Sequence, residues 1–557
     1  MKDVLKISKN KIIGASILGL IFALFNVIGS GLHNLAGLSL SLRNVILVIL
    51  FTVLFTCFNL LLFIILDKIT FEGSKKIKPS LVFVISTVSL LAVYLVIFLG
   101  VYPGLFAFDA PTQYISYVNH NMTEHHPLLH TLILGTIIKL VSPDKDSINH
   151  GVAIYTLLQS SFCALSFAYL TTYVYKKINS IIVWIISVLF FAFYPPIVLM
   201  VFSTTKDTVF LAFFMFAMTL VCEIMDGNLN SVKKTVNENA KKEDNTKNTD
   251  NKKSNNEDAQ KNGNIILIAK IILLGLCIAF MAIFRNNCIY AIPFLFIPLF
   301  IIYKKKAHIL LTLGVFIGVF LLYKYAFVPH FIANVPDGRE MYSVPIQQLM
   351  KAYTDENATI SDEDIETIEY LFDENGRIYV YGIADVPKYA VNMDYFKANK
   401  DTVKSMYLNV IKENPKDALT AFFELTAGFW YPPEELTMMP DGDKGYWPVG
   451  CYKPAVSNPK IPFIFNALKA FADSDTVRKP SFISWLFAPA SFFWLFLIMG
   501  VYAIVKKQYK FLPVFSFTLF FYLTYFLGPV VLVRYTVYLF TIVPLYFAIL
   551  GVEDKKA

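Results

Sequence analysis

Apolar segments long enough to cross a bilayer recur along most of this chain, and they leave few folds open to it. Of the 557 residues, 56% are hydrophobic and only 16% are charged, whereas soluble globular proteins carry about 25% charged residues. A helix of about 20 apolar residues spans the hydrocarbon core of a membrane. The chain is therefore predicted to be an all-α polytopic membrane protein.

About twelve transmembrane helices are predicted. The first is expected to be retained, because no small-residue cleavage site of a signal peptide follows it. A further apolar run, 128–141, is short for a span. The twelve runs are 12–32, 44–66, 80–101, 151–175, 179–201, 207–225, 264–283, 287–303, 307–327, 485–505, 511–528 and 533–550.

The distribution of Lys and Arg predicts which side each loop faces, since short loops rich in these residues stay in the cytoplasm. If 128–141 crossed the membrane, every later basic cluster would lie outside. If it lies along the outer surface or re-enters the membrane, all clusters fall inside, and both termini are cytoplasmic. We expect the second arrangement. The clusters are the N-terminus, Lys75–Lys78, Lys176–Lys177, Lys304–Lys306, Lys506–Lys510 and Lys555–Lys556.

Four parts follow from this topology. They are two N-terminal transmembrane helices (1–79), a membrane module (80–327), an extracytoplasmic, mainly helical domain (328–484) and three C-terminal transmembrane helices (485–557). Within the module, residues 226–263 are rich in Asn and Lys and contain no aromatic residue. They are predicted to be a disordered cytoplasmic loop, because such a composition buries too little apolar surface to fold.

The 328–484 region carries 15 Lys or Arg and 23 Asp or Glu, a net charge of −8. Ser361, followed by Asp364, predicts a capping box for a helix that runs to about Phe372. Asn414 and the proline after it predict the start of a helix that ends near Gly428. Residues 395–411 have helical periodicity.

The whole chain is rich in Lys, Asn, Ile and Phe. This composition indicates a Gram-positive bacterium, and we therefore expect the protein in the cell (cytoplasmic) membrane.

The outer loop with its surface helices, 102–142, holds an isolated acid, Asp109, shortly after the third apolar run. The simplest reading is a solvated acid or a helix cap. Placed at a membrane surface, the carboxylate is also a candidate general base for an incoming hydroxyl, or a ligand for one hard divalent cation. If the stretch is helical, Gln113 and Tyr117 share its face.

Three histidines follow Asp109. His125 and His126 are candidates for a hydrogen bond to a lipid phosphate or for metal ligation, and His126 and His130 have the i, i+4 spacing of a metal face. A zinc protease requires an acid between the two histidines, and this pair has none. The alternative is that these histidines are interfacial residues that cap a surface helix.

Basic residues mark the other predicted outer turns. Lys206 is a candidate for holding a phosphate, and Asp207 for a second acid near Asp109; the alternative is a helix start capped by Thr205. Arg285 interrupts hydrophobic sequence between two spans, where an ionisable group is costly unless it is paired or hydrated. Its guanidinium and that of Arg534 are candidates for bidentate phosphate binding, with interfacial anchoring as the alternative.

The chain has no P-loop, no dinucleotide-binding glycine motif, no nucleophile elbow and no zinc-protease motif. Its six cysteines suggest neither a disulfide nor a metal knuckle. No nucleic-acid partner is expected.

An outer loop with an early acid, then a histidine-proline surface helix, then closely spaced spans resembles the GT-C glycosyltransferases. Asp109 matches the catalytic acid of that family, and the His125-His126-Pro127-Leu128 sequence is similar to its motif on the second surface helix. The seven spans of 80–327 would match its membrane module. Many relatives place a second carboxylate beside the acid, whereas Asp109 stands alone in Ala107–Ala110.

The resemblance implies an inverting transfer of a sugar from a polyprenyl-phosphate donor to an acceptor outside the cell membrane. Asp109 would be the base, with a divalent cation, Mg²⁺ or Mn²⁺, left open. Arg285, Lys206 and Arg534 would hold the donor phosphate, with Asp207, His125 and His126 in support. The acceptor would be a cell-envelope glycan, a glycolipid or a protein, and membrane lipids would surround the site.

Two other functions stay open. A transporter or flippase for a lipid-linked saccharide is compatible with twelve spans, although transporter sites lie near the middle of the membrane and often within repeats. A sensor or assembly scaffold would use 328–484 as a binding module.

Overall fold

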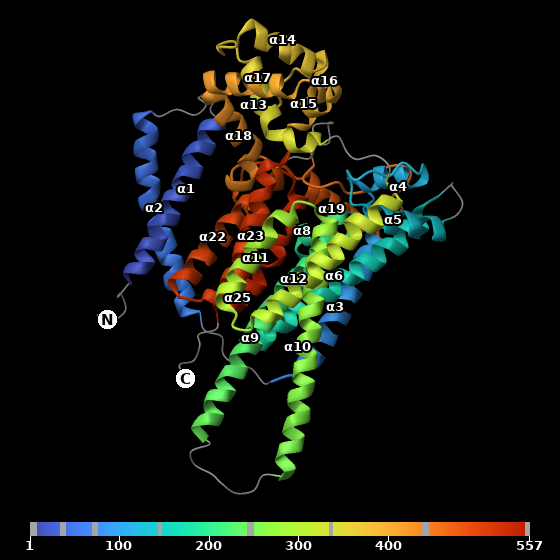
Figure 1. Cartoon of the computed structure of the whole chain (residues 1–557), viewed down its shortest axis with the longest axis vertical. Helices are drawn as coiled ribbons and strands as arrows, with labels where there is room; N and C mark the ends of the chain where they lie inside the picture. Colours follow the sequence, from blue (N-terminus) through green and yellow to red (C-terminus); the bar gives the residue numbers. More distant parts are fainter. Residues whose placement is uncertain are drawn as a thin grey trace.

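The computed structural model of this chain describes residues 8–33, 41–69, 76–142, 147–241, 250–332, 338–436 and 445–551. Every regular element within these ranges is a helix. Figure 1 shows an elongated bundle with a small helical domain at one end, while α9 and α10 project from the other end. The prediction of an all-α membrane protein is confirmed at this level.

Eight helices in the described part are long and apolar enough to cross a membrane. The chain is therefore a multi-pass membrane protein. The predicted count of twelve would also need the bent pair α7–α8 and the shorter apolar helices α11, α22 and α24–α25 to cross. The eight are α1 (Lys9–His33), α2 (Leu42–Lys68), α3 (Pro79–Gly100), α6 (Asn149–Ile178), α9 (Lys206–Lys241), α10 (Asp250–Phe284), α12 (Lys306–Leu321, continued by a π-helical turn to Phe327) and α23 (Leu512–Thr524, with its flanking turns).

The bent pair, α7 (Ile181–Phe193) and α8 (Pro195–Phe202), turns by 54° at Tyr194. Two prolines follow Tyr194. They lack backbone N–H groups and force the residue before them into an extended conformation, and Tyr194 has φ −67° and ψ 115°. The bend carries α8 toward the turn that begins α9. The shorter apolar helices are α5 (Leu128–Val141), α11 (Cys288–Ile302), α22 (Pro489–Val505), α24 (Val537–Thr541) and α25 (Val543–Leu550).

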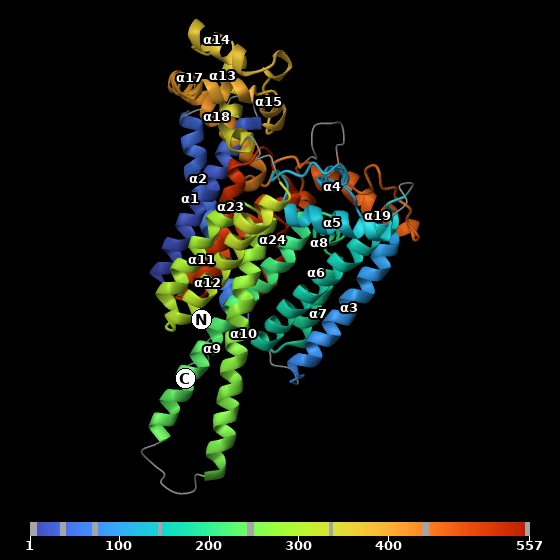
Figure 2. The ribbon, with the colours of Figure 1, turned by 45° about the vertical axis from the view of Figure 1, so that its right-hand side comes forward.

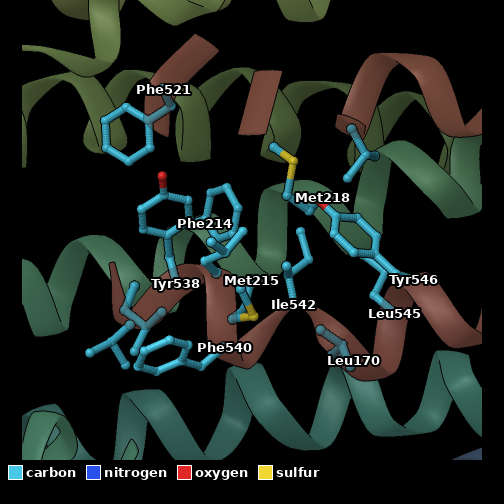
Figure 3. Close-up of a cluster of buried hydrophobic side chains, with 14 of the residues drawn as sticks. Leu170, Phe214, Met215, Met218, Phe521, Tyr538, Phe540, Ile542, Leu545 and Tyr546 are labelled. Atoms are coloured by element: carbon cyan, nitrogen blue, oxygen red, sulfur yellow. The ribbon is translucent and has the colours of Figure 1, made fainter. Parts of the chain in front are cut away.

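A core rich in aromatic and methionine side chains fixes the C-terminal helices against α9. Figure 3 shows Phe214 and Met218 of α9 between Tyr538 of α24 and Tyr546 of α25. The rings of Phe214 and Tyr538 meet edge to face, with centroids 5.1 Å apart. Such pairs add to the free energy of apolar burial. This packing holds the turn before α24 beside the first turn of α9, which is where the candidate site lies.

The described residues between α12 and α22 form two parts. Helices α13, α14, α16 and α17 share a core of their own, which includes Met350, Ile368 and Met406, and with α15 and α18 they form the separate domain at the top of Figure 1. The end of α18 joins this domain to the main core through Phe429 and Trp430. Residues 445–487 pack instead on the membrane helices, with Tyr446 and Trp447 in the main core. The helices are α13 (Ser343–Thr354), α14 (Asp362–Leu371), α15 (Asp385–Tyr389), α16 (Met393–Ala398), α17 (Lys400–Glu413), α18 (Pro415–Trp430), α19 (Pro462–Asp473), α20 (Asp475–Arg478) and α21 (Phe482–Trp485).

The helix starts and ends predicted from local sequence in this region are confirmed only in part. Ser361 caps α14, because its side chain accepts a hydrogen bond from the Asp364 backbone N–H. The Asp364 carboxylate bonds to the Ser361 hydroxyl and not to its backbone N–H, so only the first bond of the predicted capping box forms. Helix α18 begins at the proline after Asn414, although the side chain of Asn414 does not cap it. The side chain of Asn414 bonds instead to Thr359, since its Oδ1 accepts a hydrogen bond from the Thr359 backbone N–H at 2.8 Å. The single helix predicted over 395–411 is wrong, because α16 and α17 are separated by a break at Asn399.

Helices α9 and α10 continue into the segment 226–263 from either side. Residues 242–249 lie outside the described ranges. The prediction that 226–263 is a disordered cytoplasmic loop stays a prediction.

Candidate functional site

Four turns that are far apart in sequence meet at the end of the bundle that bears the separate domain of α13 to α18. The backbone N–H of Leu105 donates to Phe202 at 2.9 Å, and that of Thr204 donates back to Leu105 at 3.1 Å. These bonds align the loop before Asp109 with the loop before α9. Asp109 precedes α4 (Ala110–Val118). Lys206 and Asp207 begin α9, Arg285 follows α10, and Arg534 lies in the turn before α24.

The carboxylate of Asp109 is held by two basic side chains. Arg534 donates from Nη1 to Oδ2 and from Nη2 to Oδ1, both at 3.2 Å. Lys206 Nζ lies 3.0 Å from Oδ2. The Arg534 side chain is only 7% exposed and that of Lys206 only 14%. A bidentate guanidinium–carboxylate pair at this depth is strongly directional.

Asp207 forms the second acid of the cluster and is 2% exposed. Arg285 Nε pairs with its Oδ1, and Arg534 Nη1 lies 3.6 Å from its Oδ2. Arg534 therefore bridges both acids. With Lys206 included, three basic groups face two carboxylates, so the cluster carries a net charge of +1 and is short of one anion.

The ionisation states of the cluster follow from burial and charge. Burial raises the pKa of the Asp109 carboxyl, but the charges of Arg534 and Lys206 outweigh it and hold that pKa well below its usual value. Burial lowers the pKa of Arg534, and Asp109 more than reverses this shift, so the pKa of the guanidinium is raised. At neutral pH both groups are therefore charged.

The three predicted histidines separate. His126 Nδ1 lies 3.9 Å from Asp109 Oδ2, and burial, with the nearby charge of Lys206, lowers its pKa to about 3. The imidazole beside the acid is thus neutral near pH 7. His125 faces Glu340 of the outer domain at 3.9 Å.

His130 forms contacts between helices and does not contact Asp109. Its Nδ1 lies 3.0 Å from Gln113 Oε1, and its Nε2 lies 2.7 Å from the Tyr155 hydroxyl. These bonds join α4, α5 and α6. The i, i+4 pair of His126 and His130 therefore does not form a metal face.

The cluster does not fit a divalent cation. Both oxygens of Asp109 accept from Arg534, and Lys206 adds a second positive charge at the same carboxylate. No group of three His, Cys, Asp or Glu side chains in the described ranges is placed to hold a metal ion. A hard cation prefers several oxygen ligands, and here it would face three basic groups.

Aromatic rings that no sequence motif predicts cover the basic groups. The Arg285 guanidinium lies 4.5 Å from the centroid of the Tyr535 ring and 5.4 Å from that of Tyr525. The Arg534 guanidinium lies 4.5 Å from the centroid of Phe108. Cation–π contacts of this kind stabilise desolvated guanidinium groups. Phe108 and Tyr535 directly adjoin predicted site residues in sequence, which is the one signal that would have found them.

Each of the two arginines has one buried nitrogen without a hydrogen-bond partner. Arg285 Nη2 and Arg534 Nε are buried and have no hydrogen-bond partner. Both residues line a cavity of about 10 Å³ together with Asp207, Tyr535 and Tyr538, which is about the size of one water molecule. Buried polar groups without a partner are rare and call for an explanation. Both carboxylate oxygens of Asp207 also lack a hydrogen bond, so this cavity is lined by N–H donors and by carboxylate acceptors.

Trp447, which precedes α19, packs beside the loop that carries Asp109. Trp447 Nε1 donates to Ser203 Oγ at 3.0 Å, and its ring meets Phe108 edge to face, with centroids 5.5 Å apart. Phe108 has φ +56°, a left-handed conformation that is uncommon for residues other than glycine and clusters at functional sites. Trp447 thus packs against the strained residue that precedes Asp109.

Residues 111–530 match the family described as "Family of unknown function (DUF6020)". The chain belongs to this family. The matched range includes Lys206, Asp207 and Arg285, while Asp109 and Arg534 lie just outside its two ends. No curated protein and no solved structure matches the chain. The family match assigns no activity, so the function is argued from the site.

Proposed function

We propose that this protein is a GT-C-type membrane glycosyltransferase, which transfers a sugar from a polyprenyl-phosphate donor to an acceptor at the outer face of the cell membrane. The observation that carries the proposal is the buried cluster of three basic groups around Asp109 and Asp207, with a net charge of +1. It lies at the end of an apolar bundle, where the phosphate of a lipid meets water.

The cluster suits the charge changes of such a transfer. In the proposed reaction the bond between the sugar C1 and the phosphate oxygen breaks, and a bond from the acceptor oxygen to C1 forms with inversion. The acceptor proton passes to Asp109. The departing lipid phosphate gains negative charge, which Arg285, Lys206 and Arg534 neutralise; such preorganised electrostatic stabilisation is often the largest contribution to catalysis.

The ion pairs of Asp109 must change during this reaction. A general base works best with a pKa near the working pH, and Arg534 and Lys206 hold the pKa of Asp109 well below its usual value. A phosphate that binds Arg534 and Lys206 competes with Asp109 for the same donors. As they turn to the phosphate, the carboxylate becomes more basic at the moment it is needed. We therefore propose a base that becomes active only with the donor in place.

We also propose the orientation of the chain. Twelve spans would leave both termini in the cytoplasm and place the cluster at the outer face. In support, Lys176 and Lys177 lie in the last turn of α6, at the end far from the cluster, where they form ion pairs with Glu223 and Asp226 of α9. Lysines at this end of a span are expected on the cytoplasmic side. The acceptor class, a cell-envelope glycan, a glycolipid or a protein, stays open. No step requires a metal ion.

The test is transfer of radiolabelled sugar from a set of polyprenyl-phosphate donors by the full chain in lipid nanodiscs. We expect product from the wild type and from Asp475→Asn, a control at an outer acid that is 61% exposed. Asp109→Asn should lose transfer by about 10²-fold or more and keep its donor binding. Transfer by Asp109→Asn at the wild-type rate would remove Asp109 as the base. Tight donor binding without product in any variant would favour the transporter.

A further inference from the structure

The outer region changes the sign of its charge at its C-terminal end. Residues 328–451 contain 10 Lys or Arg and 21 Asp or Glu, whereas residues 452–487 contain five and two. The first stretch has a net charge of −11 and the second of +3. The acidic part includes the separate domain of α13 to α18, and the basic part contains α19, α20 and α21. The two parts are therefore built for different surroundings.

The basic part is fixed at the outer ends of two apolar helices. The backbone N–H groups of Asn458 and Lys460 donate to Tyr102 at 2.9 Å and to Leu99 at 2.7 Å, at the end of α3. The side chain of Ile464 packs directly on Gly100. Helix α21 ends four residues before Pro489, which begins α22. Figure 2 shows α19 beside the upper ends of α3 and α5, well below the separate outer domain.

Large apolar side chains on this segment face outward. Phe463 is 80% exposed and Phe482 is 75% exposed. Three residues beside Phe482 are also exposed: Ile483, Trp485 and Leu486. The opposite side of the segment is buried, since Ala472 and Val477 belong to the main core and Phe471 meets Phe487 edge to face at 4.9 Å. Several large apolar side chains exposed together on the surface of a soluble protein would indicate an interaction site.

Exposed lysines accompany the aromatic residues. Lys453, Lys460 and Lys469 are all exposed, and the Lys460 ammonium lies 4.9 Å from the centroid of the Tyr102 ring at the end of α3. Helices with aromatic residues on one face and Lys or Arg beside them lie in the membrane interface. Their lysines attract anionic headgroups over roughly a Debye length. Trp is itself enriched at this level of the membrane.

We propose that residues 452–487 form a lipid-contacting surface for anionic phospholipids of the outer leaflet. Phe463, Phe482 and Trp485 enter the boundary between headgroups and acyl chains, and the exposed lysines contact the headgroup phosphates. The proposal does not depend on glycosyl transfer. The same segment also contacts the loop of Asp109, because the Tyr452 backbone N–H donates to the Phe106 carbonyl at 2.8 Å. A segment bound to the headgroups would therefore hold that loop at a fixed depth in the membrane.

Spin labels on single cysteines test this directly. In a background with Cys57→Ala and Cys451→Ser, labels at Phe463→Cys and Phe482→Cys are compared with one at Tyr370→Cys, a position on α14 that is 58% exposed. The full chain is placed in nanodiscs of phosphatidylglycerol and phosphatidylcholine. Collision rates are measured with oxygen, which concentrates in lipid, and with nickel-EDDA, which stays in water. We expect labels at 463 and 482 to favour oxygen at least fivefold more than the label at 370.

Two results would overturn the proposal. Equal ratios at all three positions would place the segment in water. Protection of 463 and 482 from both reagents would show that protein covers the patch, as a second copy of the chain would. The charge is tested by Lys460→Glu with Lys469→Glu. We expect these changes to raise nickel-EDDA collisions at position 463 severalfold in phosphatidylglycerol discs but not in pure phosphatidylcholine. An equal rise in both lipids would refute the preference for anionic headgroups.

Discussion

Replacing Arg534 by Gln is expected to expose how the two acids of the cluster depend on one guanidinium. Arg534 is 7% exposed, donates to both oxygens of Asp109 at 3.2 Å, and lies 3.6 Å from Asp207. Removing one partner of a buried ion pair costs about 3–5 kcal/mol. Lys206 remains 3.0 Å from the same carboxylate. We therefore expect a loss of about 3 kcal/mol in the free energy of unfolding, at the lower end of that range.

The double variant with Asp109→Asn tests the reasoning behind this magnitude. Arg534→Gln alone takes the charge of the cluster from +1 to zero and leaves Asp109 short of a partner. Asp109→Asn alone takes it to +2. The double variant restores +1 with two neutral side chains that can bond to each other. Its loss of stability should therefore be smaller than the sum of the single losses by about 2 kcal/mol.

Equilibrium unfolding in mixed micelles of dodecyl maltoside and sodium dodecyl sulfate measures all four proteins. The matched control is the pair of Lys479 and Asp475, which lies 2.8 Å apart with the side chains 52% and 61% exposed. Exposed pairs couple by about 1 kcal/mol or less. If Arg534 and Asp109 couple no more strongly than this control pair, the cluster is not the tightly packed, desolvated arrangement described above.

Three further results are expected. The pKa of His126 is lowered to about 3, chiefly by burial, and that of Asp109 lies well below its usual value, so the folded state binds fewer protons than the unfolded state. Stability should be full above about pH 6.5, the ordinary pKa of histidine, and should fall as the pH drops toward 3. In His126→Gln the slope between pH 6 and pH 4 should be smaller by up to about 1.4 kcal/mol per pH unit; an unchanged slope would contradict the buried neutral imidazole. Trp447→Ala removes the ring against Phe108 and should lower transfer at least about tenfold with donor affinity unchanged. Trp447→Phe, which keeps a ring there, should stay within about threefold of wild type, and equal loss in both variants would argue against a positioning role. Arg285→Lys keeps the charge but not the planar fork that bonds bidentately, so equilibrium binding of a polyprenyl phosphate should weaken about tenfold, equivalent to about 1.4 kcal/mol; unchanged binding would remove Arg285 from the phosphate site.

The sequence predicted well what depends on local pattern. The apolar runs identify the membrane helices, because a span must satisfy its own backbone. Lys206, Arg285 and Arg534 stand out because charged residues are rare beside such runs. Ser361 was predictable as a cap because its partner Asp364 is three residues away. The same reasoning placed these basic residues on one side of the membrane, and the structure brings them together with Asp109.

What could not be predicted depends on packing between distant segments. Arg534 and Asp109 are 425 residues apart, and they meet only because α24 packs on α9 through contacts such as Phe214 with Tyr538. Trp447 lies in a Pro-rich loop without periodicity, so no pattern points to its contact with Phe108. The exposure of Phe463 and Phe482 could not be predicted either, because composition alone does not show which side chains of a short helix face outward.

The measurement that tests the central claim most directly is the anomeric configuration of the product formed by wild-type protein from a polyprenyl-phosphate sugar, with Asp109→Asn measured in parallel. The proposed single displacement with Asp109 as base predicts a product from the wild type alone, inverted at C1 relative to the donor. A product with retained configuration, or equal product from Asp109→Asn, would contradict the role assigned to the cluster.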